Sequence, residues 1–250
     1  YTIPGGLTAT YGDTLVDVTL PAGWSWQDDM KSVGNVGTNR FAATFTPDDT
    51  VNYKTATGIL VDVLVQPKSV VPAVTVSGDW TYTGSAITPE VRVTADGAML
   101  VEDTDYTVSY GTNVDAGEQA GSVTVTAKDG SKYTFAAVTE HFAIAPRVVT
   151  LTGVTVQEKV YDGTTAAVVN SRGTLGNAVS GKEPDYNISA AFADANVGEG
   201  KPVRLTATLT GGNAGNYVLA ENSQVTATAD IRARALENLD FSQITVTKVY

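Results

Sequence analysis

The chain of 250 residues contains no cysteine and a single histidine, His141. Without thiols there are no disulfide bonds and no cysteine nucleophile, and a zinc site would take nearly all its ligands from carboxylates. Phe142 and Ile144 share one face of an alternating strand, so His141 is expected on the other face, at the surface. A general base needs a nucleophile and an orienting partner, which this histidine lacks. We therefore expect no catalytic residue and no enzyme.

Positive charge and long apolar runs are also scarce. Lysine and arginine total 16 against 27 aspartates and glutamates, which gives a net charge of −11. An acidic surface repels phosphate backbones and anionic headgroups, so nucleic acid is not an expected partner. No apolar run approaches the roughly 20 residues that cross a bilayer, which predicts no membrane insertion in this segment. We expect no cofactor either.

Acidic pairs occur at Asp28-Asp29, Asp48-Asp49 and Asp103/Asp105. Calcium takes six to eight oxygen ligands, usually from several closely spaced side chains and carbonyls. Asp48, Asp49 and Asn52 come closest to such a set, but they form no Asp-x-Asp-x-Asp-Gly loop. The pairs are therefore expected to be solvated turn carboxylates, and we predict no metal site.

A sustained helical period is missing as well, and alternation of apolar with polar residues dominates instead. The apolar sets that alternate include Val16/Val18/Leu20, Phe41/Ala43/Phe45, Ile59/Val61/Val63/Val65, Tyr106/Val108/Tyr110, Leu205/Ala207/Leu209 and Val225/Ala227/Ala229/Ile231. Turn residues separate these runs every 8–12 residues or so. This pattern predicts an all-β protein.

What the chain does have is a repeat. Three copies share the same landmarks in the same order. Each has a tyrosine-glycine motif, an Asn-Val pair, a second tyrosine preceded by asparagine or lysine, and a closing strand. Their landmarks are Tyr11-Gly12, Asn35-Val36 and Asn52-Tyr53; Tyr82-Thr83-Gly84, Asn113-Val114 and Lys132-Tyr133; and Tyr161-Asp162-Gly163, Asn196-Val197 and Asn216-Tyr217. A period of roughly 80 residues means that one small domain was copied along the chain.

The landmarks divide the chain into repeats at 1–67, 68–147 and 148–234. Lys248-Val249-Tyr250 matches Lys159-Val160-Tyr161, so 235–250 is expected to be the first strand of a truncated fourth repeat. The connections hold prolines such as Pro67 and Pro146 instead of a Gly/Ser linker, which restricts the backbone. We expect a monomeric, extended rod in which each repeat contacts only its neighbours.

Several short strands per repeat are typical of three tandem small antiparallel β-sandwich (Ig-like) domains. A β-grasp-like repeat is the alternative, and it requires a helix across the sheet. The motif residues Tyr11, Gly12, Tyr82, Gly84, Tyr161, Asp162 and Gly163 are expected to be structural. Each glycine follows the aromatic residue, directly or after one turn residue, and is expected at positive φ. Each tyrosine is expected to pack on the sheet edge and give its hydroxyl to a backbone carbonyl.

Two further features could bind or link. Trp24 and Trp26 share a strand face, where exposed rings could stack on a sugar; the alternative is that one belongs to the core and the pair caps the domain. Lys159 and Lys248 precede motif tyrosines, and surface stalks can carry Lys–Asn cross-links in place of disulfides. Lys159 shares the parity of polar neighbours, so we expect it on the solvent face and uncrosslinked.

The third repeat, through Val160-Tyr161-Asp162-Gly163-Thr164-Thr165, resembles the bacterial surface repeat called the YDG domain. The first repeat, through Ala9-Thr10-Tyr11-Gly12-Asp13 and Asn52-Tyr53, resembles MBG repeats. The second resembles Gram-positive surface repeats through Tyr82-Thr83-Gly84, Ile87-Thr88-Pro89, Asp105–Tyr110 and Asn113–Gly117.

These resemblances imply an extracellular protein of a bacterial cell surface, whose signal and anchor lie outside this segment, and they carry over no catalytic residues. The function expected from them is a stalk or spacer of an adhesin that projects a distal functional region. The alternative is an adhesin module that binds a host carbohydrate or glycoprotein.

Overall fold

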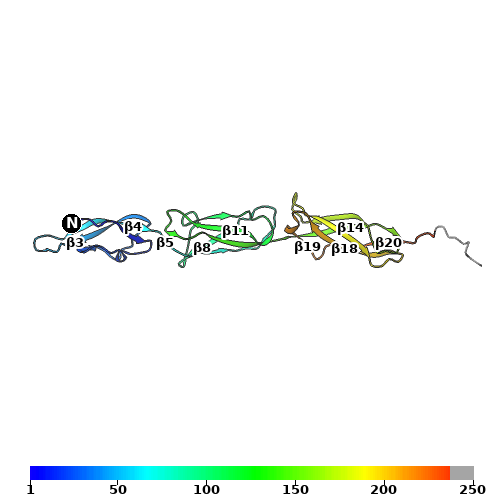
Figure 1. Ribbon diagram of the computed structural model, residues 1–250, viewed down its shortest axis with the longest axis horizontal. Coiled ribbons are helices and arrows are strands. Elements are labelled where there is room, and N and C mark those ends of the chain that lie inside the picture. The colour runs from blue at the N-terminus through cyan, green and yellow to red at the C-terminus, as the bar shows by residue number, and fades with distance from the viewer. Residues whose placement is uncertain (237–250) are drawn as a thin grey trace, which may run out of the picture. The chain divides into compact units, whose positions relative to one another are not determined.

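The computed structural model describes residues 1–236. Within this range the chain forms strands and two short 3-10 turns, η1 (Leu15–Asp17) and η2 (Ala214–Asn216), and no α-helix. Figure 1 shows strands throughout the coloured part of the chain. The all-β prediction is confirmed. The expected start of a fourth repeat at 235–250, including Lys248, lies outside the described residues except for its first two positions.

The chain divides into two compact units that do not follow the repeat boundaries. The first unit comprises Tyr1–Asp79, Ile87–Asn113 and Gln119–Phe142, and the second comprises Trp80–Ala86, Val114–Glu118 and the described chain from Ala143 onward. The first repeat therefore belongs wholly to one unit and the third to the other, whereas the second repeat is shared between them. Each unit thus contains residues of two successive repeats.

The first repeat forms one four-stranded sheet in the order β1-β4-β3-β2, with β1 (Leu7–Thr10), β2 (Trp24–Trp26), β3 (Gly37–Phe45) and β4 (Ala56–Gln66). Strand β3 pairs antiparallel with both β2 and β4. Strand β1 pairs parallel with β4, from Leu7 opposite Val63 to Thr10 opposite Gln66. The first and last strands of the repeat therefore lie side by side and run in the same direction.

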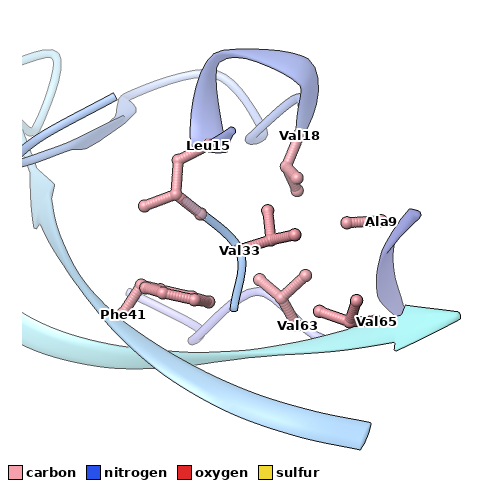
Figure 2. Close-up of a cluster of buried hydrophobic side chains, with 7 residues drawn as sticks. All are labelled: Ala9, Leu15, Val18, Val33, Phe41, Val63 and Val65. Atoms are coloured by element: carbon pink, nitrogen blue, oxygen red, sulfur yellow. The ribbon is translucent and has the colours of Figure 1, made fainter. Parts of the chain in front are cut away.

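One face of this sheet is covered by the segment that links its strands. Figure 2 shows Leu15 and Val18 facing Phe41, Val63 and Val65 of the sheet, with Val33 between them. On β4, Val63 and Val65 are buried while Leu64 between them is exposed, as the alternation predicts. Burial of each such side chain contributes about 1.5–3 kcal/mol relative to exposure.

The alternation of Val16, Val18 and Leu20 does not make a strand, so that prediction is wrong. Leu15 and Val18 are both buried while Val16 is exposed, and a spacing of three is the period of a 3-10 turn. The Val18 N–H donates to the Leu15 carbonyl at 3.1 Å, and the Thr14 N–H donates to Asp17 Oδ2 at 3.0 Å. These local bonds outweigh the strand pattern.

The second repeat contains three sheets, in the orders β10-β11-β13-β7, β6-β8-β9 and β12-β5. Its strands are β5 (Lys68–Ser69), β6 (Ala73–Val76), β7 (Trp80–Thr81), β8 (Val91–Ala95), β9 (Ala98–Met99), β10 (Tyr106–Tyr110), β11 (Gly117–Ala127), β12 (Tyr133–Thr134) and β13 (Val138–Ala145). Strands β10 and β11 pair antiparallel. Strand β7 pairs parallel with the end of β13, with Trp80 opposite Ile144.

The third repeat has two sheets, in the orders β15-β20-β18-β17 and β16-β14-β19. Its strands are β14 (Arg147–Val156), β15 (Lys159–Val160), β16 (Val169–Gly176), β17 (Asp185–Phe192), β18 (Gly198–Thr210), β19 (Tyr217–Leu219) and β20 (Thr226–Arg232). Leu151 of one sheet and Val203 and Ile231 of the other belong to the same buried cluster. Strand β15 pairs parallel with β20.

One arrangement recurs in all three repeats: β1-β4-β3-β2, β7-β13-β11-β10 and β15-β20-β18-β17. In each case the short strand before the motif tyrosine pairs parallel with the last strand of the repeat. The sheets are mixed and curled, which corrects the expectation of purely antiparallel sandwiches, because alternation reveals a strand's faces but not its neighbour's direction. A β-grasp repeat requires a helix across the sheet, and residues 1–236 form no such helix.

Candidate functional site

The motif tyrosine marks the same backbone position in every repeat. The N–H groups of Tyr11, Tyr82 and Tyr161 donate to the carbonyls of Gln66, Ala145 and Arg232, at 2.8, 2.9 and 2.8 Å. Each bond extends by one residue the parallel pair formed by the short strand before the tyrosine and the last strand of the repeat. The motif tyrosine therefore ends this ladder, and its ring is free to leave the sheet.

The motif glycines hold the turn that follows. Gly12, Gly84 and Gly163 have φ angles of +100°, +77° and +77°, as predicted. Glycine adopts this left-handed region without the steric cost that a Cβ atom brings. In the second and third repeats the residue before the glycine accepts a bond from the residue after it: Ser85 N–H to Thr83 Oγ1 and Thr164 N–H to Asp162 Oδ1.

The ring of Tyr82 packs against the third repeat. It meets the ring of Tyr217, from the third repeat, edge to face, with centroids 5.3 Å apart and planes at 76°. Tyr82, Tyr217 and Val149 form one buried cluster, bordered by Val114. Edge-to-face pairs add about 0.5–1.5 kcal/mol beyond the area they bury. The Tyr82 hydroxyl bonds to the side chains of Asn216 and Tyr217, whereas a backbone carbonyl was the expected acceptor.

Asn216, the residue before Tyr217, fixes the same contact by hydrogen bonds. Its Oδ1 accepts from the Ala116 N–H at 2.6 Å, and its Nδ2 donates to Asp115 Oδ1 at 2.9 Å. Asn216 is only 5% exposed, so both polar ends of its side chain are satisfied by the second repeat. Tyr82, Asp115, Ala116, Asn216 and Tyr217 together are called the second joint below.

Gly84 lies close to side chains of the third repeat, and a Cβ atom there would be in tight contact with two of them. A Cβ atom there would lie 3.0 Å from Val179 Cγ1 and 3.1 Å from Lys182 Cδ. Lys182 also donates from Nζ to the Gly84 carbonyl at 2.7 Å, and the Tyr217 hydroxyl donates to the Lys182 carbonyl at 2.9 Å. The motif glycine thus serves both the turn and the contact between repeats.

An equivalent contact links the first and second repeats. Tyr11 meets Tyr133 edge to face, with centroids 5.7 Å apart and planes at 80°. The Lys132 ammonium lies over both rings, 5.8 and 5.9 Å from their centroids. A cation over an aromatic face contributes about 0.5–1 kcal/mol at an exposed site. Tyr11, Lys132 and Tyr133 are called the first joint; lysine replaces the asparagine of the second.

Backbone pairing shows that the two joints are built alike. Tyr133 pairs with Lys68 in the parallel ladder of β12 and β5, and Tyr217 pairs with Arg147 in the parallel ladder of β19 and β14. Lys68 follows Pro67 and Arg147 follows Pro146, the prolines of the two connections between repeats. The sequence repeat already contained Tyr133 and Tyr217 as landmarks, but periodicity alone could not pair them with the motif tyrosines of the preceding repeats.

In the third repeat the motif is organised by Lys159. Its Nζ lies 2.7 Å from Asp162 Oδ1 and donates to the Thr164 and Ala166 carbonyls at 2.8 and 3.0 Å. Its side chain is only 16% exposed, so the expectation of a solvent-facing lysine is wrong. The bonds from Lys159 and Thr164 lower the pKa of the Asp162 carboxyl from 3.8 to about 2. The oxygen atoms around the Lys159 ammonium belong to Asp162, Thr164 and Ala166, so the lysine holds the turn together.

The two tryptophans of β2 have different surroundings. Trp26 packs against the core cluster of the first repeat, and its Nε1–H donates to the Val18 carbonyl at 2.9 Å. Trp24 contacts Phe45 at 5.3 Å and Tyr1 at 5.5 Å between centroids. Both rings are half-buried. Trp24 and Tyr1, which is 68% exposed, are the part of this group that a ligand could reach.

The histidine and the acidic residues that were considered as catalytic or metal-binding groups do not form a common site within residues 1–236. His141 is exposed on β13 while Phe142 and Ile144 are buried, as the alternation predicts. Asp49 uses both carboxylate oxygens on its own turn: Oδ1 accepts from the Asn52 N–H and Oδ2 from the Asn52 side chain. Asp105 is buried and its Oδ2 accepts from the Val101 N–H at 2.9 Å. Residues 1–236 contain no group of three or more histidine or acidic residues placed to hold a metal.

No helix within residues 1–236 has the length and apolar character needed to cross a membrane.

Comparison with known families gives two matches. Residues 145–227 match the YDG domain, and residues 52–139 match the Spiralin domain. None of the curated proteins matches the chain. The YDG match covers the repeat whose Tyr-Asp-Gly motif resembles that family, whereas the resemblance of residues 1–67 to MBG repeats stays a prediction. Together the two domain matches indicate a surface-associated protein.

Proposed function

We propose that this chain is a structural spacer in a bacterial surface protein, an adhesin stalk without catalytic activity that projects a distal functional region. The observation that carries the proposal is the equivalence of the two joints. In both, the motif tyrosine of one repeat packs edge to face on a tyrosine of the next. Motif residues that serve contact between repeats are what a stalk needs, because a stalk works by holding its repeats in line.

Small-angle scattering on the full chain tests this proposal. A compact globule of this length has a radius of gyration of about 18 Å, and a stalk must exceed that value clearly. The double variant Tyr11→Ala/Tyr82→Ala removes one ring from each joint and is expected to broaden the distance distribution. Tyr53→Ala is the control, because Tyr53 is exposed and belongs to neither joint. A radius near the globular value would rule out a stalk.

A second candidate rests on Trp24. Its half-exposed ring, with Tyr1 and Phe45 beside it, offers a surface on which a sugar ring could stack, as an adhesin module for host glycans would require. A glycan array with the Trp24→Ala variant tests it. Trp26→Ala is unsuited to this test because Trp26 supports the core. Absence of glycan binding, or binding that Trp24→Ala leaves unchanged, would eliminate this candidate.

A further inference from the structure

The three motif tyrosines share a backbone position but differ in exposure. Tyr82 is 1% exposed, whereas Tyr161 is 42% exposed. Their backbones nevertheless agree: both N–H groups bond to the last strand of the repeat, and Gly84 and Gly163 have the same φ of +77°. The turn of the third repeat therefore already has the conformation found in a joint, with its ring still open to solvent.

The valine of the Asn-Val landmark also differs in exposure between the repeats. Val36 and Val114, the valines of the Asn-Val landmarks in the first two repeats, are half-buried, and Val114 borders the buried cluster of the second joint. Val197, the corresponding valine, is 52% exposed, and so is Val160 at 54%. Val160, Tyr161, Asn196 and Val197 line one hollow together with residues 233–236, the segment that follows the last strand of the repeat. We call Val160, Tyr161, Asn196 and Val197 the outgoing face.

In the first unit, the Asn-Val loop of one repeat lies against residues of the next repeat. Asn35 and Val36 of the first repeat line one hollow together with Ser131 and Lys132 of the second. The equivalent loop of the third repeat, Asn196-Val197, lines the hollow that also contains Tyr161. The two loops thus occupy corresponding positions, and the one in the first repeat is in contact with the repeat that follows it.

We propose that the outgoing face is the docking surface for a further repeat of the same kind, one that presents Lys-Tyr at the start of a strand. The preference follows from a difference between the loops. The second repeat carries Asp115-Ala116 between Val114 and Gly117, and these two residues hold Asn216. The first and third repeats run directly from Val36 to Gly37 and from Val197 to Gly198.

A loop without the Asp-Ala pair offers an incoming asparagine neither the carboxylate nor the N–H that Asn216 uses. The first repeat has such a loop. The second repeat, which packs on it, carries Lys132, and the Lys132 ammonium contacts the rings of Tyr11 and Tyr133 instead of the loop. The third repeat therefore fits a Lys-Tyr partner better than an Asn-Tyr partner. The inference extends the proposed function, since a stalk grows by adding repeats at such a face.

Two extended chains test the inference. In one, residues 1–233 are followed by a second copy of residues 68–236, so that Ala233 takes the place of Pro67 and Lys132-Tyr133 of the copy can reach Tyr161. In the other, residues 1–233 are followed by a copy of residues 147–236, which presents Asn216-Tyr217 instead. Including the successor repeat in the first copy keeps its own second joint intact.

The measurement is hydrogen exchange of peptides covering 159–165 and 195–199, compared with the 250-residue chain. Because each appended copy repeats these peptides, protection of the original face is read from the slower component of the exchange curve. We expect exchange to slow at least about tenfold in the first extended chain and less in the second, since docking adds to the free energy of local opening. Tyr161→Ala is expected to abolish the protection, and the matched variant Tyr161→Phe to retain it. Unchanged exchange in both extended chains would overturn the docking surface, and equal protection in both would overturn the Lys-Tyr preference.

Disulfide trapping gives an independent reading, because the chain has no cysteine of its own. Val197→Cys combined with Ser131→Cys in the appended copy is expected to form a bond as readily as Val36→Cys with Ser131→Cys in the first joint. Val168→Cys, an exposed position of the third repeat away from the outgoing face, is the control. Trapping no faster than with this control would contradict docking. If trapping fails in this way but the radius of gyration is well above the globular value, the docking proposal is wrong and the spacer function is still supported.

Discussion

Tyr82 lies edge to face on Tyr217, 5.3 Å away, and the two rings are 1% and 5% exposed although they belong to different repeats. Burial raises the pKa of the Tyr82 hydroxyl above 10.0, and the nearby hydroxyl of Tyr217 and carboxyl of Asp115 raise it further. A residue that serves as a repeat landmark in the sequence is thus part of an interior that forms only when two repeats meet.

Tyr217→Ala should destabilise the second unit by about 3 kcal/mol, the loss typical of removing a buried aromatic ring. Tyr217→Phe should cost only about 1 kcal/mol, because it keeps the ring and loses the hydroxyl bonds to Val179 and Lys182. Urea unfolding followed by hydrogen exchange of second-unit peptides measures both. Equal losses for the two variants would show that the ring contact contributes nothing.

Asn216→Asp should weaken the second joint at neutral pH by about 1–3 kcal/mol, because a carboxylate cannot donate to Asp115 and repels it. Adding Asp115→Asn should restore much of the loss, since an amide at position 115 can donate in the opposite direction. A double-mutant cycle on thermal unfolding gives the coupling. Additive losses in the cycle would mean that the two side chains do not interact.

Gly84→Ala should cost more than Gly163→Ala, although both glycines have a φ of +77°. Left-handed backbone costs a residue with a Cβ roughly 1–2 kcal/mol, and this strain is common to both variants. Only at Gly84 does the added Cβ also press on Val179 and Lys182, whereas nothing lies within 4 Å at Gly163. Calorimetry on the two variants should therefore show two different melting shifts. The same shift for both would remove the packing role assigned to Gly84.

Acid should weaken the third repeat through Asp162. The folded pKa is lowered from 3.8 to about 2, so the stabilising contribution of the carboxylate is complete above pH 3.8 and is lost as the pH falls through about 2. Asp162→Asn should flatten the decline of the melting temperature over this window. Asp185→Asn is the control, since Asp185 forms an exposed ion pair with Arg172 instead. An unaltered acid profile in Asp162→Asn would contradict the role of this carboxyl.

Alkali should open the second joint. A hydroxyl whose folded pKa lies above 10.0 stabilises the folded state below pH 10 and loses that contribution as the pH rises through the folded value. The melting temperature of the second unit should therefore fall above pH 10, and Tyr82→Phe should lessen the fall. Tyr161→Phe is the control variant, because Tyr161 is exposed and lies outside the second joint.

The sequence predicted those features that depend on local pattern. The strands around Phe41–Phe45 and Ile59–Val65 lie where alternation places them, and Gly163 adopts the positive φ expected of its motif. Locally similar alternation failed at Val16 and Val18, because a 3-10 turn can bury two residues spaced by three just as a strand buries residues spaced by two.

Features that depend on distant partners could not be predicted. The parallel pairing of β1 with β4 joins residues from the two ends of a repeat, and no local pattern encodes a strand's direction. Lys159 was expected in solvent from its parity, but the carbonyls that hold it belong to the loop that follows. The joints required both a motif tyrosine and a tyrosine of the following repeat, and only coordinates show that these two meet.

The parallel pairs have a mechanical consequence. In the third repeat the chain enters through β14, which pairs parallel with β19, and leaves through β20, which pairs parallel with β15. When a hairpin is pulled at its two ends, its hydrogen bonds break one after another. Strands paired in parallel and pulled along their axes must slide, so all the bonds of the ladder carry the load together. Tension along the chain is therefore resisted by the parallel strand pairs at the beginning and the end of the repeat.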